Sequence, residues 1–243
     1  MRYAVLSDVH ANLEALEVVL GDIAGRGPDA IISLGDFVGY GPDPVECVER
    51  LRGGLAGAVV GNHDLAALER TDIAMFNPYA RAAIVWTREQ LTVGVRTYLG
   101  DLPRELRRAA FLAVHGSPRD PTDEYLFDAL TARASFESVE FRLGLVGHTH
   151  VPGVFIHDGE RVSARPLTPD DVLELRPTHR YLINVGSVGQ PRDGDPRAAY
   201  LWLDEDALRA KLIRLAYPIE RTQEKMRAAG LPEVLAERLS QGR

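Results

Sequence analysis

Five apolar runs in this chain each end in a short cluster of glycine, histidine and acidic or amide residues. In chain order the clusters are SDVH (7–10), GDFVGYG (35–41), GNHD (61–64), VHG (114–116) and GHTH (147–150). Short apolar runs bounded by such polar residues are typical of buried strands. In open α/β sheets, ligands bind beyond the carboxyl ends of the strands. The chain is therefore expected to fold so that five loops meet at one rim.

Helices are expected between the early strands, and antiparallel hairpins later in the chain. Periodic apolar positions and helix-capping residues predict helices at 12–24, 44–52 and 77–91, and a broken helical end from Ile219. Turn residues predict hairpins within 153–164 and 198–216. No repeat, low-complexity tract or linker interrupts the 243 residues. We therefore predict one α+β domain over residues 1–243.

Composition limits the classes of partner. Lys and Arg total 28 against 35 Asp and Glu, so the formal net charge is -7. Proteins that bind a nucleic-acid backbone usually carry a basic field, which makes nucleic acid an unfavoured main partner. No apolar run is long enough to span a membrane, and no signal peptide is evident. The single cysteine, Cys47, is expected to be a buried hydrophobe in a cytoplasmic protein.

The histidines indicate a metal centre. Five of the seven histidines lie in the clusters, beside acidic and amide side chains. Imidazole, carboxylate and amide oxygen together favour divalent transition ions such as zinc, manganese, iron or nickel. Seven candidates are too many for one four-coordinate ion, and a carboxylate such as Asp36 can bridge two ions, which favours a dinuclear site. The candidate ligands are Asp8, His10, Asp36, Asn62, His115, His148 and His150.

The ordered set DVH, GDFVGYG, GNHD, VHG and GHTH resembles the signature of the calcineurin-like metallophosphoesterase superfamily. The later segment INVGSVGQPRDGDP is similar to the small prokaryotic phosphodiesterase-like branch of that superfamily. The resemblance implies a four-layer sandwich, in which two mixed β-sheets pack face to face and helices flank them. It also implies two divalent transition metal ions (Mn²⁺, Fe²⁺/Fe³⁺, Ni²⁺ or Zn²⁺) and a small phosphate ester as substrate.

The resemblance assigns roles to the cluster residues. It implies one ion held by Asp8, His10, Asp36 and His150, and a second held by Asp36, Asn62, His115 and His148. A metal-bound hydroxide would attack phosphorus, while His63 meets the substrate and assists the leaving group. His63 and its neighbour Asp64 are the candidate catalytic residues.

The chain departs from the superfamily at one motif. Many members, notably the protein serine/threonine phosphatases, have G-D-x-x-D-R-G where this chain has GDFVGYG. Gly39 stands in place of the Asp that would orient the catalytic histidine, and Tyr40 in place of the Arg that would bind a dianionic phosphate. The departure argues against protein phosphatase activity and leaves the residue that orients His63 open.

Other residues are candidates for binding substrate. Gln190 and Arg192 lie in a polar, glycine-bearing loop, where a plain turn is the alternative. Tyr40 is expected either at the pocket mouth or packed beneath GPDP. Asn62 and His63 are the remaining candidate substrate-binding residues. The segment DEYLFDAL (123–130) is a candidate cap over the site, and Trp86 is expected in the core or at a contact within a homo-oligomer.

The function predicted is hydrolysis of phosphodiester bonds of a small, nucleotide-like substrate by a dinuclear metal-dependent phosphoesterase. A phosphomonoesterase or dinucleoside polyphosphate hydrolase is the alternative enzyme. A nuclease is disfavoured by the acidic balance of the chain. A non-catalytic metal-binding scaffold is disfavoured because every ligand position and His63 are occupied by suitable residues.

Overall fold

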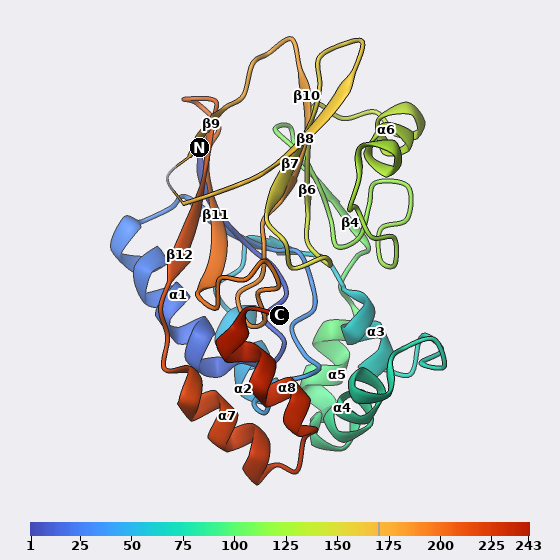
Figure 1. The fold of residues 1–243 in the computed structure, drawn as a ribbon, viewed down its shortest axis with the longest axis vertical. Coiled ribbons are helices and arrows are strands. Elements are labelled where there is room, and N and C mark those ends of the chain that lie inside the picture. Colours follow the sequence, from blue (N-terminus) through green and yellow to red (C-terminus); the bar gives the residue numbers. More distant parts are fainter. Residues whose placement is uncertain (170) are drawn as a thin grey trace.

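Two six-stranded sheets form the centre of the protein (Figure 1). The computed structural model describes residues 1–169 and 171–243. The first sheet has the order β3 (Gly57–Ala58), β2 (Ala30–Ser33), β1 (Arg2–Leu6), β11 (Ala198–Asp204), β12 (Arg209–Leu215) and β9 (Val172–Glu174). The second has the order β4 (Glu105–Arg107), β5 (Leu112–Val114), β6 (Leu143–Val146), β10 (Arg180–Asn184), β7 (Gly153–His157) and β8 (Val162–Pro166).

Both sheets are mixed. Strand β1 pairs in parallel with β2 and antiparallel with β11. Strand β10 likewise pairs in parallel with β6 and antiparallel with β7. In the first sheet the parallel strands β1, β2 and β3 come from the strand-helix alternation of the first half, and in the second sheet β10 joins β5 and β6 in parallel, while hairpins supply antiparallel strands. The carboxyl ends of the parallel strands therefore lie together at one edge of each sheet.

Helices cover the outer faces of the sheets and also pack beyond the ends of the strands. They are α1 (Leu13–Arg26), α2 (Pro44–Arg52), α3 (Asn62–Ala67), α4 (Pro78–Gln90), α5 (Val93–Gly100), α6 (Ala129–Ser138), α7 (Ile219–Ala228) and α8 (Glu233–Glu237), followed by a 3₁₀ turn at Arg238–Gln241. Figure 1 shows α1 and α2 beside the first sheet and α6 beside the second.

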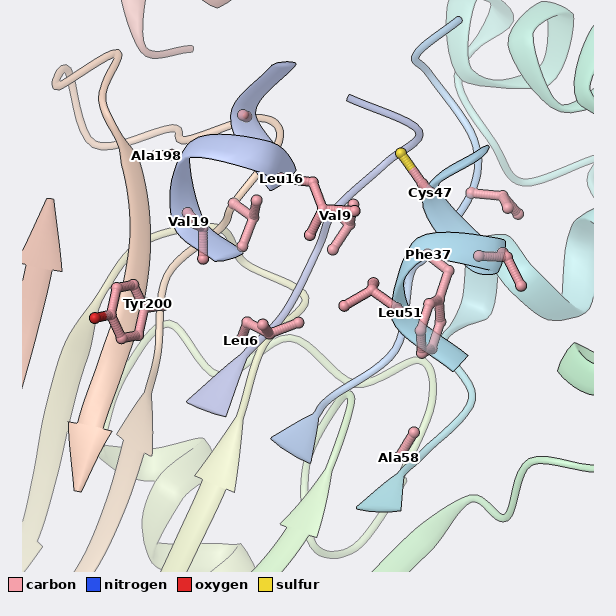
Figure 2. Close-up of a cluster of buried hydrophobic side chains, with 14 of the residues drawn as sticks. Leu6, Val9, Leu16, Val19, Phe37, Cys47, Leu51, Ala58, Ala198 and Tyr200 are labelled. Carbon is pink, nitrogen blue, oxygen red and sulfur yellow. The ribbon is translucent and has the colours of Figure 1, made fainter. Parts of the chain in front are cut away.

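Alternating side chains in the strands separate the layers. Val5 of β1 is buried between the sheets, in one cluster with Leu145 of β6 and Ile183 of β10. Its neighbour Leu6 faces the other way, toward Leu16 of α1, as Figure 2 shows. On the far side, apolar residues of β5, β6 and α6 form a separate cluster. The predicted four-layer α+β sandwich is confirmed.

Most predicted elements are present, with small differences at their ends. The hairpins β7–β8 and β11–β12 and the break between α7 and α8 follow the predicted pattern. Helices α3 and α5 and the short strands β4 and β9 were not predicted, because segments of three to eight residues carry little periodic signal. Cys47 is fully buried among apolar side chains, as expected (Figure 2). Within the described residues, no helix has the length and apolar character needed to cross a membrane.

The C-terminal helices pack close to one of the polar clusters. Leu235 and Leu239 share an apolar cluster with Tyr40, and the partly buried Trp86 packs against it. Trp86 therefore contributes to the core, which was one of its two predicted places. This packing brings residues from the end of the chain to the GDFVGYG loop.

Candidate metal centre

The strand ends bring the predicted ligands together. Asp8 and His10 follow β1, Asp36 follows β2, and His115 follows β5. Asn62 begins α3 just after β3, and the GHTH segment follows β6. All seven candidate ligands are buried: Asp8, His10, Asp36, Asn62, His115, His148 and His150. Side chains as far apart in sequence as His10 and His150, which are 140 residues apart, therefore meet at one place.

The ligands form two groups. Asp8, His10 and His150 make one group, and Asp36, His115 and His148 make the other; within each, one ligand atom per residue lies within 4.8 Å of the others. Asn62 joins the second group, since its Oδ1 lies 3.1 Å from Nε2 of His115. Each group has the composition and spacing needed to hold a metal ion.

Asp36 lies between the two groups. Its Oδ2 is 3.5 Å from Nε2 of His10 in the first group and 3.3 Å from Nε2 of His115 in the second. Oδ1 of the same carboxylate accepts a hydrogen bond of 2.9 Å from the backbone N–H of His63, which fixes the orientation of the carboxylate. One carboxylate oxygen thus faces both groups, as a bridging ligand requires.

Backbone carbonyls determine which nitrogen of each histidine faces the centre. Nδ1 of His10, His115 and His150 lies 3.1, 2.8 and 2.6 Å from the carbonyls of Val38, Leu34 and Gln190. A carbonyl only accepts hydrogen bonds, so Nδ1 carries the proton in each ring and Nε2 faces the centre. His148 is reversed: its Nε2 donates to the Asp123 carbonyl at 3.1 Å, and its Nδ1 faces inward.

The ligand atoms that face the centre are suited to binding divalent cations. Nε2 of His10 and Nε2 of His150 are 3.0 Å apart, so two lone pairs face each other when both rings are neutral. Oδ1 of Asp8 and Oδ2 of Asp36 are buried without a hydrogen-bond partner. Buried carboxylate oxygens and converging lone pairs are unfavourable unless a cation lies among them. The donor set of imidazole, carboxylate and amide suits transition metal ions.

Burial keeps most of the histidines neutral. It lowers the pKa of His10 and His150, and it lowers that of His148 to about 3. His115 behaves differently: burial opposes protonation, but the charge and hydrogen bond of Asp36, together with Asp8 and the Leu34 carbonyl, outweigh it and raise the pKa to about 10. Neutral imidazoles are the form that binds metal, and at His115 a metal ion would displace a proton.

The backbone is strained where these side chains turn inward. Asp8, His10, Asp36, His148 and His150 all have φ between 48° and 65°, in the left-handed region that L-residues seldom adopt. Such strain gathers at functional sites. Gly61 permits a further close approach, because a Cβ there would lie 2.0 Å from Oδ1 of Asp36. The close approach at Gly61 is thus made to a carboxylate.

The ring of His63 is packed among other aromatic rings, and no carboxylate of the described residues contacts its Nδ1. Its ring centroid lies 4.4 Å from that of Tyr40, 5.1 Å from that of Phe76 and 4.8 Å from that of His10. Nδ1 of His63 is buried and has no hydrogen-bond partner. Burial lowers the pKa of His63 to about 4. The ring is therefore neutral at pH 7 and offers one N–H donor.

Asp64 stabilises the loops around the site. Its carboxylate accepts hydrogen bonds from the backbone N–H groups of Asp36 (2.9 Å), Gly61 (3.0 Å) and Val38 (3.2 Å). Burial and the nearby Asp36 raise the pKa of Asp64 to about 7. These contacts join the GDFVGYG and GNHD loops.

Arg192 lies beside the same cluster. Its guanidinium is 5.5 Å from the centroid of Tyr40 and donates to Oε1 of Gln190 at 2.7 Å. Its Nε is buried without a partner. The positive charge of Arg192 is one of the influences, after burial, that lower the pKa of His63 and of His150. The loop after β10 thus places a guanidinium next to the histidines.

Three residues at the site did not follow from the strand-end motifs. Phe76 contacts His63, the Asp123 carbonyl accepts from His148, and Tyr125 stacks on His148 at 3.8 Å and 17°. Asp123 and Tyr125 belong to the segment DEYLFDAL, which was considered as a cap. In the sequence, only the closeness of this segment to the VHG motif indicates that it would lie at the metal centre.

Comparison with known proteins identifies the family of this chain. The sequence model of the calcineurin-like phosphoesterase superfamily domain matches residues 1–207. The chain belongs to this superfamily. It is a calcineurin-like metallophosphoesterase, and the superfamily together with the two Asp/His groups indicates divalent metal ions as cofactors.

Individual relatives extend over nearly the whole chain. An uncharacterized protein of Methanocaldococcus jannaschii is 39% identical, over 99% of this chain and 98% of its own. The crystal structure of a metallophosphoesterase from Sphaerobacter thermophilus is 46% identical, with a TM-score of 0.91 and coverage of 100% and 99%. A hypothetical protein from Pyrococcus horikoshii, 22% identical with a TM-score of 0.81 and coverage of 100% and 98%, shares the fold. The expected superfamily is confirmed.

Proposed function

We propose that this metallophosphoesterase binds two metal ions and hydrolyses phosphodiester bonds of a small substrate. The observation that carries the proposal is the position of Asp36, whose Oδ2 faces both His10 and His115. A single bridging carboxylate between two nitrogen-rich groups is the arrangement of two-metal phosphoryl-transfer sites. Asp8, His10, Asp36 and His150 would hold one ion, and Asp36, Asn62, His115 and His148 the other.

Bound ions would supply an activated water and neutralise charge on the phosphoryl oxygens. The protein's own contribution is positioning. Carbonyls of Leu34, Val38 and Gln190 hold the three inward-facing Nε2 atoms in place. Asp64 holds the loops that carry Asp36 and Asn62, so we assign its part in catalysis to positioning these loops.

His63 is the residue we assign to the leaving group. It lies among Tyr40, His10 and Phe76, beside both metal groups. As a neutral ring it can donate one hydrogen bond to the departing oxygen. A bound phosphate adds negative charge near the ring, which favours protonation and hence transfer of a proton to that oxygen.

Substrate binding is assigned to Asn62, His63, Tyr40, Gln190 and Arg192. Of these, Arg192 supplies the positive charge, and Gln190 orients its guanidinium. The unpartnered Nε of Arg192 also favours the second candidate function, a phosphomonoesterase, because a dianionic phosphate is usually met by a guanidinium. We prefer the diester as substrate, because Tyr40 stands where the motif of many superfamily members has the arginine that binds a dianionic phosphate.

The deciding experiment compares two substrates that share a leaving group. We expect kcat/KM for bis-p-nitrophenyl phosphate to exceed that for p-nitrophenyl phosphate, with Mn²⁺, Zn²⁺, Ni²⁺ or Fe²⁺ added and metal content measured on the same samples. Faster turnover of the monoester under every metal would reverse the assignment in favour of a phosphomonoesterase. Arg192→Gln should then reduce the monoester rate more than the diester rate.

A further inference from the structure

Three aromatic rings form a stack that leads outward from the metal centre. Tyr125 lies on the ring of His148, with centroids 3.8 Å apart and planes 17° apart. Phe127 continues the stack, 5.3 Å from Tyr125 with planes 9° apart. We call His148, Tyr125 and Phe127 the aromatic ladder. Its inner end is a candidate metal ligand, and its outer end is solvent-facing.

The outer rings are exposed to an unusual degree for aromatic side chains. Phe127 is 66% exposed and Tyr125 is 45% exposed. Exposed apolar groups next to a functional centre mark a binding site more often than scattered single residues do. Phe127 also borders a cavity of about 310 Å³, whose other walls include Thr149, Val151 and Phe155. Thr149 lies in the chain between two candidate ligands.

The segment that carries the ladder is held in place. Glu124 accepts from Ser117 at 2.5 Å and from Nε of Arg119 at 3.0 Å. The Asp123 carbonyl accepts from His148 at 3.1 Å. Anchored rings lose little conformational freedom when a ligand stacks on them, which favours binding. The ladder is therefore preorganised on the same loop that orients His148.

The ladder begins at the metal centre, where the phosphate of a substrate would bind. A ligand bound here would place an anionic group at the metal centre and a planar apolar group on the exposed ring of Phe127. A nucleotide combines these two features, because its base stacks and its phosphate is anionic.

We propose that the aromatic ladder is a subsite for a planar aromatic group of the substrate, and that the substrate is a nucleobase-bearing phosphoester. This inference rests on the proposed function for the position of the phosphate. Stacking of a base on an aromatic side chain requires the ring and tolerates any base. The subsite should accordingly select for aromaticity and not for one base.

The test uses binding of two probes to the metal-loaded protein. AMP and ribose 5-phosphate share the phosphate and the sugar and differ in the base. Isothermal titration calorimetry should give an affinity for AMP about tenfold or more above that for ribose 5-phosphate, the size expected of one stacked base. Phe127→Leu retains apolar volume without the ring and should bring this ratio toward one, whereas Phe127→Trp should restore it.

Leu130 provides a matched control, because it is 79% exposed and follows the ladder closely in the chain without belonging to it. Leu130→Ala should leave the ratio unchanged. Equal losses in Leu130→Ala and Phe127→Leu would overturn the ladder in favour of a general apolar docking patch, as would a wild-type ratio near one. A protein that prefers AMP but hydrolyses no phosphoester would contradict the proposed function and leave the ladder supported.

Discussion

Gly39 lies directly beneath the ring of His63: a Cβ atom at position 39 would stand 2.6 Å from Nδ1 of His63. The backbone at Gly39 also has φ +87°, where L-residues are strained. Gly39 occupies the motif position at which many superfamily members have aspartate. In this chain the aspartate would have no room, and ring packing takes over the orientation of His63.

Gly39→Ala is expected to destabilise the protein by about 2 kcal/mol or more, from left-handed strain together with the clash against His63. It should also lower turnover, because the ring of His63 must move. Urea unfolding and steady-state kinetics measure the two effects. Gly53→Ala is the control, since that glycine has φ −82° and no atom within 4 Å of an added Cβ. Equal stability of both variants would show that position 39 tolerates a side chain.

Asp36→Ala is expected to abolish or nearly abolish binding of both metal ions, because the shared carboxylate faces both groups. Asn62→Ala should weaken mainly the second ion, because it removes a neutral ligand from one group. Elemental analysis of metal-saturated samples should give two ions per chain in the wild type. Equal loss of metal in the two variants would contradict the bridging role, and a wild-type stoichiometry of one would contradict the dinuclear centre.

The metal-free protein is expected to lose stability as pH rises above 7. The pKa of His115 is raised to about 10 in the folded state, above the unfolded value of about 6.5, so the folded protein holds one more proton between these values. That stabilisation is fully present below pH 6.5 and is lost as pH rises through 10. The slope from this residue is about −1.4 kcal/mol per pH unit. Urea unfolding of chelator-treated protein at pH 7.5 and 8.5 measures it.

His115→Gln should remove this slope from the metal-free protein. Metal-loaded wild type should also lack it, because the ion replaces the proton between His115 and Asp36. A metal-free wild type whose stability is flat between pH 7.5 and 8.5 would show that His115 is not protonated there.

His63→Ala is expected to retain both metals while losing activity in a way that depends on the leaving group. Help from a general acid contributes roughly 10²–10⁴-fold when the leaving oxygen is basic, and much less for p-nitrophenolate. The variant should therefore lose far more kcat/KM on an alkyl or ribose diester than on bis-p-nitrophenyl phosphate. The same loss on both substrates, with metals intact, would mean that His63 positions phosphate. Loss of the metals would make it a ligand or a structural support.

The set of residues that meet at the centre could be predicted from sequence. Asp8, Asp36, His115 and His148 each follow an apolar run, and parallel strands place their carboxyl ends at a common edge. Apolar runs likewise predicted the buried strands, and the turn residues predicted the hairpins. These are local signals, because each depends only on residues that are close together in the sequence.

The orientation of those residues was decided by tertiary contacts. Nδ1 of His115 lies against the Leu34 carbonyl, 81 residues away in the chain, and this contact selects the nitrogen that faces the centre. The fit of Gly39 under His63 and the stacking of Tyr125 on His148 have the same origin. Residue types and spacings specify which groups can meet, but distances of a few ångströms depend on how both sheets and their loops pack together.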